Sequence, residues 1–390
     1  MPNMPRIALL VETSRGYGRG ILQGIIRYAR LHGPWSFYIT PGDFEQALPA
    51  MKQWGGTGII ARIETPQTAR AIRATGLPVV CLDYSAAQAA MTETPWKVSE
   101  VHPDPVASID LAIEHLVGRA FKRLAFVGIP GRIWSDQRQA AFAQRVKQQR
   151  RARFIYKPPR AKRDREWDRE QEMLGQWLKD LPKPVGLVAC NDDRGRQVLE
   201  AAMAAGVQVP DEVAVVGIDN DEVLCELSTP PLSSVMLNTD KGGYEIAELL
   251  DGLMSGRVRG PRQLTVEPLW VITRRSTDAL GIDDREVAAA LRFIRENRGR
   301  PFGVGDILQE ICISRRSLEL RFQKTLRRSV RQEIQNVHLE WARQLLAETD
   351  MALPNVAQKS GFSTASYLGQ VFRKRYGVTP SQYRKRISQS

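Results

Sequence analysis

Residues that bind metals or form disulfides are scarce in this chain. The 390 residues include only four cysteines and four histidines. The cysteines stand far apart and form no C-x-x-C pair; they are Cys81, Cys190, Cys225 and Cys312. Such spacing gives no structural metal site and favours reduced thiols. We therefore expect no metal centre.

Long apolar runs are also missing. The apolar run near the N-terminus, Ile7 to Val11, has five residues, which is too short for the apolar region of a secretory signal. No stretch approaches the ~18 apolar residues of a membrane-spanning helix. The sequence predicts a cytoplasmic protein without a membrane partner.

Basic residues are concentrated in the last quarter of the chain. Residues 283–390 contain 20 Lys and Arg against 11 Asp and Glu, a net charge of +9, whereas the preceding 282 residues carry only +4. A basic excess confined to one segment indicates a polyanionic partner for that segment.

Up to about residue 275, short apolar runs alternate with segments of helical period. The expected strands are 6–11, 35–39, 58–62, 78–83, 123–129, 152–157, 185–190 and 213–219. The expected helices are 18–32, 66–75, 105–118, 136–150, 168–179, 194–205 and 240–255. This alternation predicts an α/β fold with parallel sheets flanked by helices.

The stretch "ETSRGYGRGILQG" (12–24) follows the first expected strand, as a dinucleotide-binding loop would. Its glycines are spaced two and two, whereas the dinucleotide fingerprint requires two and three. Thr40 stands where an acidic ribose partner is expected. We expect no nucleotide cofactor; a tight turn without a ligand remains open, as does a small-molecule contact through Arg15, Tyr17 or Arg19.

Polar residues follow several of the expected strands. They are Arg62, Asp83-Tyr84, Asn191-Asp192-Asp193 and Asp219-Asn220. Ligands of open parallel sheets bind beyond the carboxyl ends of the strands. Carboxylates accept hydrogen bonds from hydroxyl groups and guanidinium groups donate to them, so this set suits a hydroxyl-rich ligand.

Three segments resemble the ligand-binding domain of lactose/galactose-repressor-type regulators, which are relatives of periplasmic sugar-binding proteins. They are residues 102–128, "WSDQRQAAF" (134–142) and residues 184–235. The resemblance implies a periplasmic-binding-protein-like sensor over 1–278, with two lobes that close on a sugar and crossings near 104 and 235–270. It implies ligand-binding roles for five residues, namely Asp104, Arg138, Trp167, Asn191 and Asp219. Regulators of that type begin with a helix-turn-helix, which is missing before the first strand here.

The last 110 residues predict an all-α domain, 279–390, with two helix-turn-helix units. The units cover 304–326 and 353–387, joined by a helix over 331–348. They repeat internally. Leu308/Ala357, Cys312/Gly361 and Ser314/Ser363 align at an offset of 49, and Leu318/Leu368 and Phe322/Phe372 at an offset of 50. The i,i+4 pairs mark the buried stripe of each second helix.

A helix-turn-helix reads bases from near the N-terminus of its second helix. The predicted base-reading residues lie off the buried stripe; they are Arg315, Arg316, Glu319, Thr364, Ala365, Ser366 and Gln370. Basic residues further along are predicted to contact phosphates; they are Lys324, Arg373, Lys374 and Arg375.

The segment "SGFSTASYLGQVFRKRYGVTPSQYR" (360–384) resembles the AraC/XylS family of regulators. A sugar-repressor-like sensor joined to such a domain resembles regulators of the xylose-operon type. The combination implies an activator of pentose (xylose) utilisation genes that binds double-stranded DNA and acts as a homodimer in contact with RNA polymerase. The alternatives are an α/β oxidoreductase with an appended DNA-binding domain, a transport component, and a regulator that senses a sugar phosphate, another sugar or no small molecule.

Overall fold

The computed structural model describes residues 4–39, 50–63, 65–83, 96–158, 167–279, 281 and 284–388. These residues form two compact units. The N-terminal unit comprises Met1–Val117 and Lys122–Asp278, and the C-terminal unit comprises Ala279–Ser390 with the short segment Gly118–Phe121. None of the described helices combines the length and the apolar character needed to cross a bilayer.

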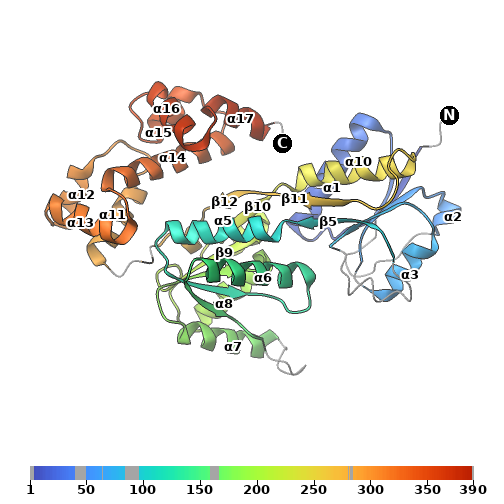
Figure 1. Cartoon of the computed structure of the whole chain (residues 1–390), viewed down its shortest axis with the longest axis horizontal. Helices are drawn as coiled ribbons and strands as arrows, with labels where there is room; N and C mark the ends of the chain where they lie inside the picture. The colour runs from blue at the N-terminus through green and yellow to red at the C-terminus, as the bar shows by residue number, and fades with distance from the viewer. Residues whose placement is uncertain are drawn as a thin grey trace. The chain divides into compact units, whose positions relative to one another are not determined.

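The N-terminal unit contains two six-stranded sheets, each of which defines a lobe (Figure 1). The lobe 1 sheet is parallel throughout, in the order β11-β5-β4-β3-β1-β2. Its strands are β1 (Arg6–Leu10), β2 (Ser36–Ile39), β3 (Gly58–Arg62), β4 (Val79–Leu82), β5 (Ser99–Pro103) and β11 (Gln263–Val266). The helices whose sequences adjoin these strands are α1 (Gly16–His32), α2 (Met51–Trp54), α3 (Pro66–Ala74) and α10 (Thr239–Met254).

The lobe 2 sheet has the order β12-β10-β9-β8-β6-β7, with only β12 antiparallel to its neighbour. Its strands are β6 (Arg123–Val127), β7 (Ala152–Ile155), β8 (Val185–Ala189), β9 (Val213–Asp219), β10 (Ser233–Leu237) and β12 (Pro268–Ile272). The helices in its sequence are α5 (Pro105–Gly118), α6 (Ile133–Gln148), α7 (Trp167–Asp180), α8 (Asp192–Ala204) and α9 (Glu222–Leu227). A 3₁₀ turn, η2 (Arg275–Thr277), follows β12.

The chain passes between the two sheets three times, between β5 and α5, between β10 and α10, and between β11 and β12. The predicted α/β class with parallel sheets is confirmed. Four strands were not predicted from the sequence, namely β5, β10, β11 and β12. All four lie at or next to a sheet edge. Strands β5 and β11 are only partly buried, so their sequences lack the continuous apolar runs of central strands. Strand β10 is mostly buried but begins with two serines, and β12 carries the short apolar run 269–272.

The glycines of the segment 12–24 lie inside helix α1, which begins at Gly16 rather than at residue 18. A Cβ on Gly20 would lie 2.0 Å from Thr239 Oγ1, and one on Gly24 would lie 2.0 Å from the Asp240 carbonyl oxygen of α10. These glycines therefore permit close packing of α1 against α10. They do not form a phosphate-binding turn.

The C-terminal unit is helical, with seven described helices after residue 284. They are α11 (Arg285–Glu296), α12 (Val304–Ile311), α13 (Arg315–Leu326), α14 (Val330–Glu348), α15 (Leu353–Lys359), α16 (Ala365–Tyr376) and α17 (Pro380–Ser388). The pairs α12/α13 and α15/α16 are the two predicted helix-turn-helix units. Helix α14 contributes Val330 and Ile334 to the first core and Leu345 and Leu346 to the second.

Each unit turns through a residue in the left-handed conformation, Cys312 (φ 50°) in the first and Gly361 (φ 76°) in the second. Ser314 caps α13 by accepting the Ser317 N–H. Helix α16 is capped by Thr364 and not by Ser363, because the Thr364 hydroxyl accepts the Tyr367 N–H. The second turn is therefore one residue longer, and the caps align at an offset of 50 rather than 49.

His338 of α14 lies against the turn of the second unit. A Cβ on Gly361 would be 2.5 Å from His338 Cε1, and the imidazole ring meets Phe302 and Phe362 edge-on. Among the described residues its buried Nε2 has no hydrogen-bond partner. Burial lowers the pKa of His338 to about 4.

This pKa predicts a pH-dependent stability of the C-terminal unit. The unfolded state binds a proton below about pH 6.5 and the folded state does so only near pH 4, so stability falls as the pH drops through this window. At pH 5 the penalty is on the order of 1–2 kcal/mol. Calorimetry of the full chain should show that His338→Leu gains stability over the wild type between pH 7.5 and pH 5. A constant difference between the two proteins would contradict the assignment.

Candidate functional site

Five side chains from both lobes form a polar cluster at the ends of the sheets. Lobe 1 contributes Tyr17 from α1, Arg62 at the end of β3 and Asp83 just after β4; lobe 2 contributes Arg138 from α6 and Asp219 at the end of β9. Arg62 Nη2 is 2.5 Å from Asp83 Oδ2, and the Arg62 guanidinium carbon lies 5.6 Å from the Tyr17 ring centroid. Arg138 Nη2 donates to Asp219 Oδ1 at 3.1 Å. We call these five residues the polar cluster.

The two halves of the polar cluster interact across the lobe boundary. Burial raises the pKa of Asp219, an effect that Arg138 opposes from its own lobe, Arg62 opposes from the other, and Asp83 reinforces. Burial likewise raises the pKa of the Tyr17 phenol, and Asp83 and Asp219 add to that rise from opposite lobes. The five groups therefore share one electrostatic environment.

Two buried oxygen atoms of this cluster lack a hydrogen-bond partner among the described residues. They are Tyr17 Oη and Asp83 Oδ1. Both aspartates also adopt positive φ angles, 52° for Asp83 and 111° for Asp219. Unpaired buried polar atoms and strained backbone are costly, and they concentrate where a ligand binds. Hydroxyl groups of a small molecule would satisfy these atoms.

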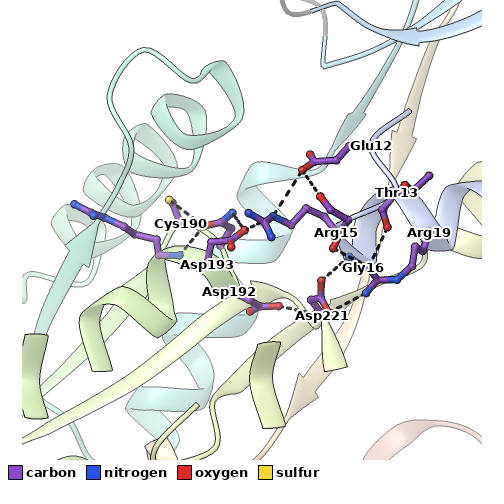
Figure 2. A network of polar contacts seen from close by, with 12 residues as sticks. Glu12, Thr13, Arg15, Gly16, Arg19, Cys190, Asp192, Asp193 and Asp221 are labelled. Atoms are coloured by element: carbon purple, nitrogen blue, oxygen red, sulfur yellow. Dashed lines mark hydrogen bonds and ion pairs between the residues drawn. The ribbon is translucent and has the colours of Figure 1, made fainter. Parts of the chain in front are cut away.

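A second set of contacts joins the N-terminus of α1 to lobe 2 (Figure 2). The Gly16 N–H donates to Asp221 Oδ2 at 2.6 Å, Arg19 Nη2 is 3.0 Å from Asp221 Oδ1, and Arg15 Nε is 2.9 Å from Asp193 Oδ2. We call these five residues the α1 latch. Glu12 lies 3.7 Å from Arg15 and completes the network on the lobe 1 side.

Asp221 acts as a helix cap supplied by the opposite lobe. The residue before α1, Arg15, makes no side-chain cap of its own, so the first N–H groups of the helix need an external acceptor. The positive end of a helix dipole favours a carboxylate there. A Cβ on Gly16 would lie 2.9 Å from Asp221 Cα, which explains why glycine occupies this position.

Asp192 positions Asp221 of the α1 latch, and both of its carboxylate oxygens accept hydrogen bonds within lobe 2. Its Oδ2 accepts the Asp221 N–H at 2.7 Å and its Oδ1 accepts the Ser234 hydroxyl at 2.5 Å. Burial raises the pKa of Asp192 well above its usual range, with Asp219 adding to the effect. The contacts give Asp192 a structural role that the sequence did not indicate, whereas its predicted ligand contact stays a prediction.

Two other predicted ligand residues cap helices. Asn191 accepts the Arg194 N–H at the start of α8. Asp104 accepts the N–H groups of Val106 and Ala107 at the start of α5, where the chain crosses between lobes.

The structure does not place Trp167 within the polar cluster; it begins α7 with 58% of its surface exposed. Among the described residues, Trp134 is an aromatic neighbour of the cluster, and its ring centroid lies 5.6 Å from the Arg138 guanidinium carbon. Trp134 was not predicted as a site residue, although it opens the segment "WSDQRQAAF", and Asp83 was predicted only as a polar residue at a strand end. Asp221 carried no signal, because its partner is 205 residues away.

In the C-terminal unit, α13 and α16 expose most of the predicted DNA-contacting side chains. Arg315, Arg316, Lys324, Ser366, Gln370, Arg373 and Lys374 are all exposed. Glu319 is half-buried, and its Oε2 accepts the Val330 N–H at the start of α14. Thr364 uses its hydroxyl as the α16 cap. Glu319 and Thr364 thus have structural partners that the sequence did not indicate, and their base-reading roles stay predictions.

The α1 latch generates a stability prediction. Asp221→Ala removes a buried carboxylate and leaves the Gly16 N–H and Arg19 without it, which should lower the free energy of unfolding of the N-terminal unit by ~1–2 kcal/mol. The matched control is Asp193→Ala, which breaks a more exposed ion pair and should cost ~0–1 kcal/mol. Urea unfolding of the full chain measures both. An equal or larger loss in Asp193→Ala would show that Asp221 is not the main element of the α1 latch.

Comparisons with known families cover almost the whole chain. The XylR N-terminal domain matches residues 6–98, the periplasmic binding protein-like domain matches residues 113–277 and a helix-turn-helix domain matches residues 307–386.

Several relatives match this chain over almost their whole length. The xylose operon regulatory protein of Escherichia coli (strain K12) is 31% identical over 383 residues, which cover 97% of this chain and 96% of the relative. Its counterpart in Haemophilus influenzae is 29% identical, with 97% and 98% covered. A solved structure described as the xylose-binding transcription activator XylR is 30% identical, with a TM-score of 0.62 and 98% of both chains covered. The chain therefore belongs to the family of xylose operon regulatory proteins, which are transcription regulators.

Proposed function

We propose that this regulator binds a neutral pentose, D-xylose in the first instance, between its two lobes and binds double-stranded DNA through α13 and α16. The observation that carries the sugar site is the polar cluster, with the unpaired Tyr17 Oη and Asp83 Oδ1. The names of the relatives support xylose as the ligand.

The charges around the site favour a neutral ligand over a sugar phosphate. Each arginine has a carboxylate partner. The pairs are Arg62–Asp83, Arg138–Asp219, Arg15–Asp193 and Arg19–Asp221. A phosphate group would have to displace one of these carboxylates and leave it buried without its partner, which is costly. Sugar hydroxyls can join the existing pairs without displacing a charge.

Response to the sugar requires a difference in affinity between conformations. A ligand that bridges Arg62 and Asp83 of lobe 1 and Arg138 and Asp219 of lobe 2 stabilises the closed arrangement of the lobes, because it contacts both only when they are together. The protein would act in the cytoplasm as a homodimer, so that two chains present four helix-turn-helix units. Activation of transcription would then involve contact with RNA polymerase.

A thermal-shift panel of purified full-length protein tests the ligand. D-Xylose at about 100 times its Kd should stabilise the N-terminal unit by ~2.7 kcal/mol, which corresponds to a rise of several degrees in Tm. Other pentoses, hexoses and xylose phosphate serve as comparisons. A larger shift with the phosphate than with the neutral sugar would refute the neutral-ligand proposal.

Asp219→Asn tests the site itself. The amide preserves the size of the side chain but loses the charge that pairs with Arg138, so sugar affinity should fall about 10- to 100-fold. DNA binding in the absence of sugar should be unchanged, because Asp219 lies in the other unit. Isothermal titration with xylose and a DNA mobility shift measure the two properties. Unchanged sugar affinity would remove Asp219 from the site.

Two substitutions on the reading helices separate base contacts from phosphate contacts. Arg316→Ala should cost ~1–3 kcal/mol and relax the preference at one base position. Lys374→Ala should weaken specific and random duplexes alike and reduce the salt dependence. Competition binding at several salt concentrations distinguishes them. Equal effects of both changes on specific and random DNA would count against the assignments.

A further inference from the structure

Helices α13 and α16 are matched residue for residue at an offset of 50. Each has twelve residues and begins after a hydroxyl cap, Ser314 or Thr364. Each buries a leucine and a phenylalanine four residues apart, Leu318/Phe322 in α13 and Leu368/Phe372 in α16. Equivalent positions on the two outward faces can therefore be compared directly.

The centre of the outward face of α13 is an apolar residue, Leu320. At about 100° per residue, position 320 lies about 160° around the helix from both Leu318 and Phe322, which are buried. Its side chain is 63% exposed. Arg316 and Lys324 lie one turn to either side, on the same row of the helix, and both are exposed.

The matched row of α16 is Ser366–Gln370–Lys374, and all three side chains are exposed. Leu320 therefore occupies the position of Gln370, which is predicted to contact a base. The rows end alike in lysine but differ at their centres. Leu320 is not among the base-contacting candidates that polarity or charge alone would select.

We propose that Leu320 contacts the 5-methyl group of a thymine in the major groove and makes the first helix-turn-helix selective for thymine at that base pair. This inference rests on the proposed function, in which α13 enters the major groove. The thymine methyl is the apolar group on the major-groove edge of the bases. The exposed basic neighbours Arg316 and Lys324 suit the negative potential of DNA on either side of Leu320.

The contact should have a measurable and limited size. Burying one methyl group contributes ~0.8 kcal/mol, which corresponds to about a fourfold change in affinity. Since Leu320 is exposed in the free protein, its replacement should leave the folded state intact. Any change in DNA affinity can then be attributed to the interface.

The test uses full-length protein and duplexes selected by it from a random pool. Each thymine of the preferred duplex is replaced singly by uracil, which removes only the methyl group. Wild-type protein should lose about fourfold in affinity at one thymine within the site of the first unit. Leu320→Ala should bind the thymine duplex about fourfold more weakly or worse, and it should be indifferent to uracil at that position.

Gln370→Ala is the matched control, because it changes the equivalent residue of α16. It should keep the full sensitivity to uracil at the thymine assigned to Leu320. Selective binding with no sensitivity to any uracil replacement would overturn the Leu320 proposal alone, as would sensitivity that persists in Leu320→Ala. Failure of the wild type to select any duplex would overturn the proposed DNA-binding function and this inference with it.

Discussion

The carboxylate of Asp221 at the N-terminus of α1 is a buried polar contact that joins the two lobes directly. It accepts the Gly16 N–H and the Arg19 guanidinium from lobe 1, and its own backbone N–H is held by the buried Asp192 of lobe 2. A helix N-terminus attracts an anion, and in many nucleotide-binding proteins that anion is a phosphate. Here a carboxylate of the same chain satisfies the helix. The segment 12–24 therefore stands where a phosphate-binding loop would stand in the sequence. In this structure it contacts a carboxylate of the opposite lobe instead of a phosphate.

The polar cluster follows from this contact, because the α1 latch holds Tyr17 between the two lobes. Tyr17 is one residue from Gly16, and its phenol interacts with Asp83 of lobe 1 and with Asp219 of lobe 2. The arginines of both lobes are already neutralised by aspartates. For the proposed ligand, the binding energy would then come mainly from hydrogen bonds to the buried Tyr17 Oη and Asp83 Oδ1, which lack partners in the described part of the chain. A site of this kind would discriminate by the geometry of hydroxyl groups, because an analogue that lacks one hydroxyl would leave a buried polar atom unpaired.

Central elements of the fold were predictable from sequence because their residues are buried on both sides. The strand "VGLVA" is fully buried as β8, and its continuous apolar run identified it. Edge strands such as β11, with mostly exposed or half-buried residues, gave no such pattern. In the site, Arg62, Arg138 and Asp219 were predicted from their positions at strand ends or from the family resemblance. Asp221 was not, since its partner Gly16 lies 205 residues away. Trp134 was not either, although it stands four residues before Arg138 on α6, a spacing that places both side chains on one face of the helix. Local patterns report burial and caps, but they do not report contacts between lobes.

The two helix-turn-helix units have matching residues in their separate cores and differ on the outward faces of α13 and α16. Selection for folding explains the common part, because Leu318/Phe322 and Leu368/Phe372 must pack against the two ends of α14. Nothing in folding requires the outward rows to differ, since exposed positions contribute little to stability. The rows Arg316–Leu320–Lys324 and Ser366–Gln370–Lys374 expose different groups, which under the proposed function face two successive segments of the major groove. In the proposed function, one chain would then recognise two different half-sites, and such a pair of half-sites can be occupied in only one direction.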